Sequence, residues 1–284
     1  MNTQNKGFFI GLIISCVSLN LYAVVYKHDD VLVELSDSSR PLSVFNVSSY
    51  NGLKEAEEAN QVLLERSNFE TLLKEAGPWI CKHEMQDYIG LRLLHKHNDL
   101  SAGDRMVEYF SDEYDDGALV TGKFLPVDES SGEPLKAVPS IWAAASVENE
   151  EPFFALEYTT DEGGRAAYAK ISTQQEFLVG LRSILAGHNL EDLIGISSIT
   201  RLSLKAKADQ VFMELIDLDL VENVLLLTDV KDPLMSSSIQ TSWRFEALNP
   251  QEGIITHGCK TVTVCIHTPI ASFKKTVHKK TKSK

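Results

Sequence analysis

The chain has 284 residues, of which 43% are hydrophobic and 24% are charged, so it can bury the core of one large domain or two small ones. Its formal net charge is -13 at pH 7, although the closing stretch FKKTVHKKTKSK holds lysines and no acidic residue. The body is therefore acidic and the tail basic. An acidic body argues against nucleic acid as a partner, because such binding relies on Lys and Arg that neutralise phosphates.

The first 26 residues predict export or a membrane anchor. Lys6 precedes an apolar run over residues 7–19, and the small residue Ala23 follows at a position where a signal peptidase could cut. Two alternatives stay open. Residues 7–26 are long enough to remain in a membrane as an anchor, and residues 13–16 resemble a bacterial lipobox, which would make Cys16 a lipidated first residue. The predicted localisation is thus secreted, periplasmic or membrane-anchored, with membrane association through this segment.

Residues 27–273 are expected to form a single domain, followed by a disordered basic tail over residues 274–284. Outside the N-terminal segment three cysteines remain, namely Cys81, Cys259 and Cys265, so at most one internal disulfide can form. Cys259 and Cys265 would lie about 20 Å apart on a continuous strand. A bond from Cys81 to one of them is the expected pairing.

Two principal helices are predicted. Apolar residues recur at helical spacing over residues 53–76, and Gly77 and Pro78 are expected to end this helix. A second helix begins after Thr173, which with Glu176 makes a capping-box pattern, and it ends at Gly187.

Most other apolar runs are short, rich in β-branched and aromatic residues, and bounded by turn residues, which is typical of strands. They cover residues 88–95, 105–110, 118–125, 137–147, 152–160, 211–220, 222–230, 239–248 and 261–269. Because strands and helices do not alternate, we expect an α+β fold with a mainly antiparallel sheet. No nucleotide cofactor is expected, because residues 117–123 have phosphate-loop spacing but Phe124 stands where Ser or Thr should bind magnesium.

The segment LRLLHKHND contains the strongest candidate site. On a strand, Leu91, Leu93, His95 and His97 would share one face, so the histidines continue an apolar face. Two imidazoles at i and i+2 that point into a partly buried layer suit a divalent metal, since each can be held neutral by a second partner. The alternative is that the two histidines have a purely structural role at the end of a strand.

Cys265 and His267 repeat the same spacing near the C-terminus, and two histidines with this pair would suit zinc. An objection lies in the same strand. Val262, Val264 and Ile266 look like its core face, which puts Cys265 and His267 on the opposite face. A joint site of all four residues and a site of His95 and His97 alone therefore both stay open.

Several short motifs resemble a family of uncharacterised, mostly fungal proteins that carry an LLH(K/R)H segment. They are LLHKH, Gly103-Asp104, Met106-Val107-Glu108, SWRF at residues 242–245, and a cysteine and a histidine near the end. The resemblance implies no particular activity. The hydrophobic N-terminus of this chain departs from that family.

Two hypotheses follow. In the first, the protein is a metal-dependent hydrolase or oxygenase with a strand-borne divalent-metal site at His95 and His97. In the second, it is a non-enzymatic secreted or envelope interaction protein with structural histidines. The sequence identifies no partner.

Overall fold

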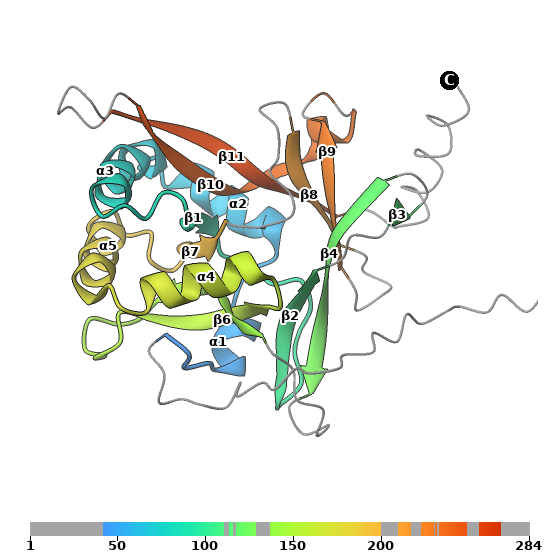
Figure 1. Ribbon diagram of the computed structural model, residues 1–284, viewed down its shortest axis with the longest axis horizontal. Coiled ribbons are helices and arrows are strands. Elements are labelled where there is room, and N and C mark those ends of the chain that lie inside the picture. The colour runs from blue at the N-terminus through green and yellow to red at the C-terminus, as the bar shows by residue number, and fades with distance from the viewer. Residues whose placement is uncertain are drawn as a thin grey trace, which may run out of the picture. The chain divides into compact units, whose positions relative to one another are not determined.

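The computed structural model describes residues 42–110, 114–115, 118–128, 137–199, 210–216, 223–229, 231, 233–248 and 256–267, and the fold over these residues is α+β (Figure 1). The strands are β1 (Ile89–Leu93), β2 (Asp104–Phe110), β3 (Tyr114–Asp115), β4 (Ala118–Asp128), β5 (Val138–Ala144), β6 (Phe153–Thr159), β7 (Ile194–Ser198), β8 (Gln210–Ile216), β9 (Asn223–Asp229), β10 (Ile239–Leu248) and β11 (Thr256–His267). The helices are α1 (Val47–Asn51), α2 (Ala56–Glu65), α3 (Phe69–Lys82), α4 (Glu162–Ile171), α5 (Gln175–Gly187) and the short 3₁₀ helix η2 (Pro233–Ser237).

The strands form one mixed, mostly antiparallel sheet in the order β2-β6-β5-β7-β1-β10-β11-β8-β9-β4-β3. The pairs β2–β6 and β11–β8 are parallel, whereas the other pairs are antiparallel. An additional pairing of β2 with β4 connects the two sides of this order, so that the sheet closes on itself. Strands that are far apart in the order, such as β6 and β8, can therefore face each other across the interior.

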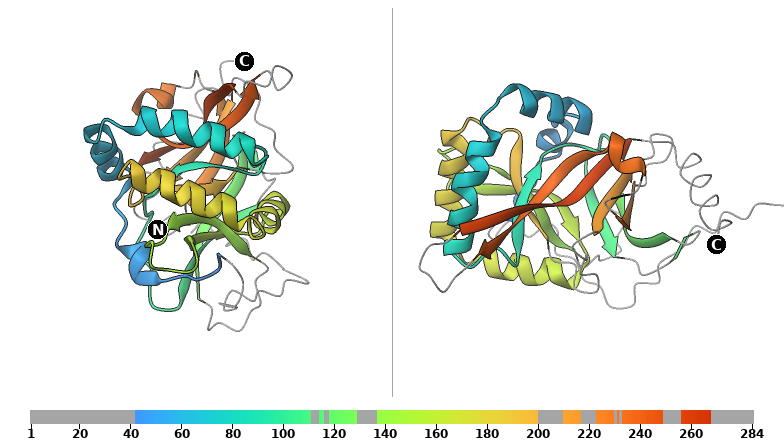
Figure 2. Two further views of the ribbon diagram at one scale, coloured as in Figure 1. Left: turned by 90° about the vertical axis from the view of Figure 1, so that its left-hand side faces the viewer. Right: turned by 90° about the horizontal axis from the view of Figure 1, so that it is seen from above.

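Two clusters of buried side chains lie on opposite faces of the sheet. The helix-side cluster joins α3 and α5 to one face through residues such as Leu72, Ile80, Phe177 and Leu181, and α3 and α5 lie side by side (Figure 2). The inner cluster lies on the other face. Its members are Tyr50, Leu94, Leu100, Met106, Ile141, Ala143, Leu156 and Phe212.

A β-bulge on β6 changes which side chains face the inner cluster. Ile141 of β5 pairs with Glu157, but the next residue, Trp142, pairs with Ala155, so Leu156 is an extra residue. Trp142 and Ala155 belong to the helix-side cluster, whereas Ile141 and Leu156 belong to the inner cluster. Because a bulge shifts the alternation by one residue, Glu157 shares the face of Ile141.

The predicted strands are confirmed, and so is the second predicted helix, which is α5, whereas the first helix differs from the prediction. The expected helix over residues 53–76 is two helices, because Ser67 adopts a left-handed backbone conformation with φ 45° between them. Gly77 and Pro78 do not end α3. Proline removes one helical hydrogen bond, but continuing the helix buries Ile80 and Cys81 in the helix-side cluster.

The predicted capping box of α5 is not formed. Gln174 is the N-cap residue without a side-chain cap, and the Thr173 hydroxyl donates to the carbonyl of Lys170. The reason is α4, which ends directly before this turn and which the sequence analysis did not predict.

Cys81 is a free, buried thiol, so the expected disulfide is wrong. It lies on α3 in the helix-side cluster, and burial raises the pKa of its thiol. In the ranges that the structure describes, no helix combines the length and the apolar character needed to cross a membrane. Residues 1–26 and 274–284 lie outside these ranges, and their assignments stay predictions.

Gly90 allows β1 and β10 to approach closely. A Cβ atom at this position would lie 2.1 Å from the Trp243 carbonyl oxygen. Because that neighbour is backbone, we expect Gly90→Ala to lower the free energy of unfolding by about 1–3 kcal/mol in urea denaturation. Gly187→Ala is the control, since nothing lies within 4 Å of its added Cβ. Equal stability of the two variants would contradict this account of Gly90.

Candidate metal centre

His95 and His97 follow β1 rather than lying on it, which corrects the expected strand-borne site. The strand ends at Leu93. Beyond it the backbone N–H of Leu94 still donates to the Leu193 carbonyl, in the register of the β1–β7 pair, but that of Lys96 donates to the Lys54 carbonyl, which belongs to no strand. The chain therefore leaves the alternation of β1, and the histidines do not share the helix-side face of Leu91 and Leu93. Both imidazoles are fully buried.

The third member of the centre is Glu214 of β8, which the sequence analysis did not single out. His95, His97 and Glu214 are all buried, and one potential ligand atom from each lies within 4.8 Å of the other two. Glu214 is held by Arg92 of β1, whose guanidinium donates to Oε2 at 2.9 Å. The opposite oxygen, Oε1, makes no hydrogen bond with the described residues and lies 3.2 Å from Nε2 of His97.

The imidazole of His95 is held in the tautomer that suits a metal ligand. Its Nδ1 lies 2.8 Å from the carbonyl oxygen of Leu93. Because a carbonyl can only accept, Nδ1 carries the hydrogen and Nε2 carries a lone pair. Nε2 is shielded from solvent and has no hydrogen-bond partner among the described residues. A buried acceptor without a partner is costly, so this atom is expected to bind something.

The distances between these polar atoms lie at or beyond the upper end of the hydrogen-bond range, and they suit ligands around one ion. Nε2 of His97 lies 3.2 Å from Glu214 Oε1, and Nε2 of His95 lies 3.9 Å from Glu214 Oε2. Nitrogen and oxygen ligands bound to zinc at about 2.0 Å in a tetrahedron are separated from each other by about 3.3 Å. The spacing is therefore close to that of a ligand set.

Burial and neighbouring charges shift the pKa values of the two histidines in opposite directions. Burial and the positive charge of Arg92 lower the pKa of His95 to about 3, so its ring is neutral near pH 7. Burial alone would lower the pKa of His97, but Glu214 and Glu157 outweigh it and raise that pKa. Burial alone would raise the pKa of Glu214, yet His97 and Arg92 lower it to about 2. Glu214 is thus a carboxylate, as a metal ligand must be.

Tyr50 of α1 borders the centre. Its hydroxyl accepts the backbone N–H of His97 at 3.3 Å. Burial and the negative charge of Glu157 raise its pKa well above the ordinary value, so the hydroxyl stays protonated. The Asn51 side chain fixes this helix end, since it donates to the Leu100 carbonyl and accepts the Leu100 N–H.

The side chains of Cys265 and His267 lie outside what the structure describes. Their backbone is placed, however. Cys265 pairs in register with Glu214 on the parallel strand β8, and His267 pairs with Ile216. The joint site therefore stays a prediction.

No protein-family model, curated protein or solved structure matches this chain. The resemblance to the LLH(K/R)H family stays an expectation from the sequence. The geometry of the site is therefore the indication of function.

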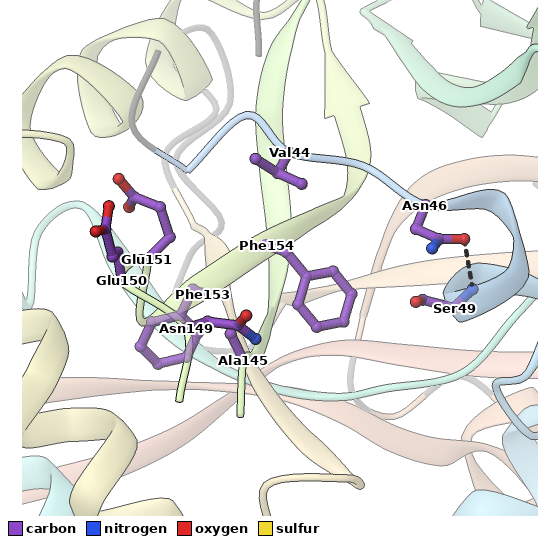
Figure 3. A pocket seen from close by; sticks show the side chains of 9 residues that line it. All are labelled: Val44, Asn46, Ser49, Ala145, Asn149, Glu150, Glu151, Phe153 and Phe154. Atoms are coloured by element: carbon purple, nitrogen blue, oxygen red, sulfur yellow. Dashed lines mark hydrogen bonds between the residues drawn. The ribbon is translucent and has the colours of Figure 1, made fainter. Parts of the chain in front are cut away.

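A surface cavity of about 400 Å³ lies between the first residues of β6 and α1 (Figure 3). Val44, Phe153 and Phe154 give it apolar walls, and Glu150 and Glu151 line one side. None of the three residues of the metal centre lines it. Ser49 does line it, and the next residue, Tyr50, borders the centre.

Breaking the buried pair of Arg92 and Glu214 on one side should destabilise the metal-free protein. Arg92→Met leaves the Glu214 carboxylate buried without this partner, so we expect a loss of about 3–5 kcal/mol in urea denaturation with a chelator present. Adding Glu214→Met should recover much of that loss, because both charges are then gone.

The control is Arg66→Met. This residue pairs with Asp192 at the surface, where the two side chains are 33% and 57% exposed. Its removal should cost about 1 kcal/mol or less. If Arg92→Met behaves like Arg66→Met, or if the double variant is no more stable than Arg92→Met alone, the importance assigned to the buried pair is wrong.

The centre also predicts how the metal-free protein responds to acid. The pKa of His95 is about 3 in the folded protein and 6.5 as the ordinary value, so the unfolded chain binds a proton that the folded chain does not. Stability from this residue is present above pH 6.5 and is lost as the pH falls from 6.5 toward 3. Glu214 loses its contribution between pH 4.5 and about 2. His97, with a raised pKa, contributes below its ordinary 6.5 and loses this as the pH rises through the folded value.

His95→Asn keeps an N–H donor near the position of Nδ1 and removes the group that must stay neutral. Between about pH 6.5 and about pH 4.5 the parent should lose about 1–3 kcal/mol more stability than this variant. Urea denaturation at both pH values with a chelator present measures the difference. An identical loss in parent and variant would contradict the neutral, buried state of His95.

Proposed function

We propose that the protein is an exported metalloprotein in which His95, His97 and Glu214 bind one divalent transition-metal ion. One observation carries the proposal. The Leu93 carbonyl orients His95 so that the lone pair of its buried Nε2 points to the space shared with His97 and Glu214, where no described residue offers it a hydrogen bond. Histidine ligands in metalloproteins are held in this way, with the second ring nitrogen donating to a carbonyl or carboxylate.

The ligand types favour a metal that performs chemistry. Two imidazoles and one carboxylate bind catalytic zinc in hydrolases and non-haem iron in oxygenases, and both sets keep coordination positions open. Such an ion would act as a Lewis acid or activate a small molecule. We therefore propose a metal-dependent hydrolase or oxygenase. Because the three side chains are fully buried, its substrate would be small or would enter after a local opening.

The same burial favours a second candidate, a non-enzymatic exported protein in which the centre stabilises the fold. The histidine side chains and Glu214 are 0% exposed, and inner-cluster residues such as Leu94 and Phe212 are close in the chain. A metal in that position would connect the end of β1 to β8.

Export is proposed from the N-terminal segment alone. The charged Lys6 and the apolar run over residues 7–19 support a signal peptide, with a retained anchor or lipidation at Cys16 as the alternatives. If the segment is retained as an anchor, or if Cys16 is lipidated, the protein is associated with a membrane through this segment. The resemblance to the LLH(K/R)H family adds no activity.

Elemental analysis of the purified full-length chain, prepared without a histidine tag, tests the metal. We expect about one equivalent of zinc, iron or manganese in the parent protein, since the site offers one ligand set. The double variant His95→Ala, His97→Ala should lose this metal, because two of the three ligands are gone.

His188→Ala is the matched control. Nε2 of this histidine lies 2.8 Å from Oε2 of Glu75, and neither residue belongs to the centre. Its removal should therefore leave the metal content unchanged. Circular dichroism of each variant shows whether it is folded. A parent that holds no metal, even after incubation with each candidate ion, would refute the proposal, as would a folded double variant that retains it.

A further inference from the structure

Glu157 of β6 is a second buried carboxylate beside the centre. Its Oε1 lies 3.5 Å from Nε2 of His97, and the side chain is 3% exposed. We infer that Glu157 is a fourth protein ligand, so that the ion joins β6 to β8 and to the end of β1. This inference rests on the metal site proposed above and adds a ligand to it.

The bulge on β6 brings Glu157 to the centre. Without the extra residue Leu156, regular pairing would place position 157 on the same face as Ala155, which packs in the helix-side cluster. With the bulge, Glu157 pairs with Ile141 and, across the parallel pair, with Met106. Both of these residues belong to the inner cluster. Bulges recur next to functional sites because they redirect a side chain in this way.

Glu157 also has an oxygen atom with no described partner. Its Oε2 is shielded from solvent and makes no hydrogen bond with the described residues. The same holds for Oε1 of Glu214 and Nε2 of His95. Buried polar atoms are rarely left in this state, and three of them on residues that all lie next to His97 point to a common partner. A cation is a partner to which two carboxylate oxygens and an imidazole nitrogen can all donate lone pairs.

The charges of the buried groups agree with this assignment. Arg92 is bound to Glu214, so it balances one carboxylate of the centre. The carboxylate of Glu157 is the second, and its Oε1 lies beside His97, at 3.5 Å from Nε2. A divalent ion supplies the positive charge that a second buried carboxylate calls for.

A fourth ligand links the identity of the ion to the function. Zinc with four protein ligands is closed in its usual tetrahedron, as structural zinc sites are. Manganese or iron prefers about six ligands, so the same four groups would keep positions open for a small molecule. With Glu157 as a ligand, zinc favours the stabilising role, and manganese or iron favours the enzyme.

The test compares the full-length parent with Glu157→Gln and Glu157→Asp. Zinc affinity is measured by competition with a chromophoric chelator, and the geometry is read from the visible absorption of the Co²⁺-substituted protein. Glu157→Gln should weaken zinc binding about tenfold or more and change the Co²⁺ spectrum, because an amide is a poor ligand. Glu157→Asp keeps the charge but withdraws the oxygens by one methylene, so it should also lose affinity and change the spectrum.

Glu108→Gln is the matched control, since Glu108 is another buried glutamate, on the neighbouring strand β2. It should bind zinc as the parent does. If Glu157→Gln keeps the affinity and Co²⁺ spectrum of the parent, the inference is wrong although the metal site stands. If Glu157→Asp alone matches the parent in both, Glu157 acts through its charge and is not a ligand. A parent without measurable metal binding would instead refute the proposed function itself.

Discussion

The buried pair of Arg92 and Glu214 is the constraint on which the interior depends. β1 and β8 are separated in the sheet by β10 and β11, so this pair spans the interior instead of joining neighbouring strands. Two charges taken out of water repay their desolvation only when their geometry is good and their remaining atoms are satisfied. Arg92 holds Oε2 of Glu214 and thereby turns Oε1 toward the histidines. This contact fixes how the Glu214 carboxylate is oriented within the candidate centre.

Much of the fold could be predicted from the sequence, because strands leave a local signal. Short apolar runs between turn residues marked the principal strands, and their order excluded alternating βα units. The helices were harder. A left-handed Ser67 splits one periodic stretch into α2 and α3, and a continuous apolar pattern does not reveal such a break. Pro78 gave the opposite error, since tertiary packing outweighs its low helix propensity.

The candidate site was only half visible in the sequence. The pattern H-x-H singled out His95 and His97, but period-two reasoning placed them on the wrong face because β1 ends before them. Glu214 lies in a strand whose residues 211–214 are all buried, so alternation did not distinguish it. A charged residue inside an apolar run was the available signal, since such a residue is buried only with a partner. Glu157 offered no comparable signal, because its face depends on a bulge that forms only between paired strands.

The polar groups of the interior are better explained by function than by stability. Replacing a buried ion pair with well-packed apolar residues is often neutral or stabilising, so Arg92 and Glu214 are not required to hold a sheet together. His95 must stay neutral at a site where its pKa is about 3, and its Nε2 finds no described donor. Strongly shifted pKa values that arise from burial together with specific charged neighbours are typical of functional sites. A bound divalent ion would resolve these features together, because it would accept the lone pairs of His95 and His97 and offset the carboxylates beside them.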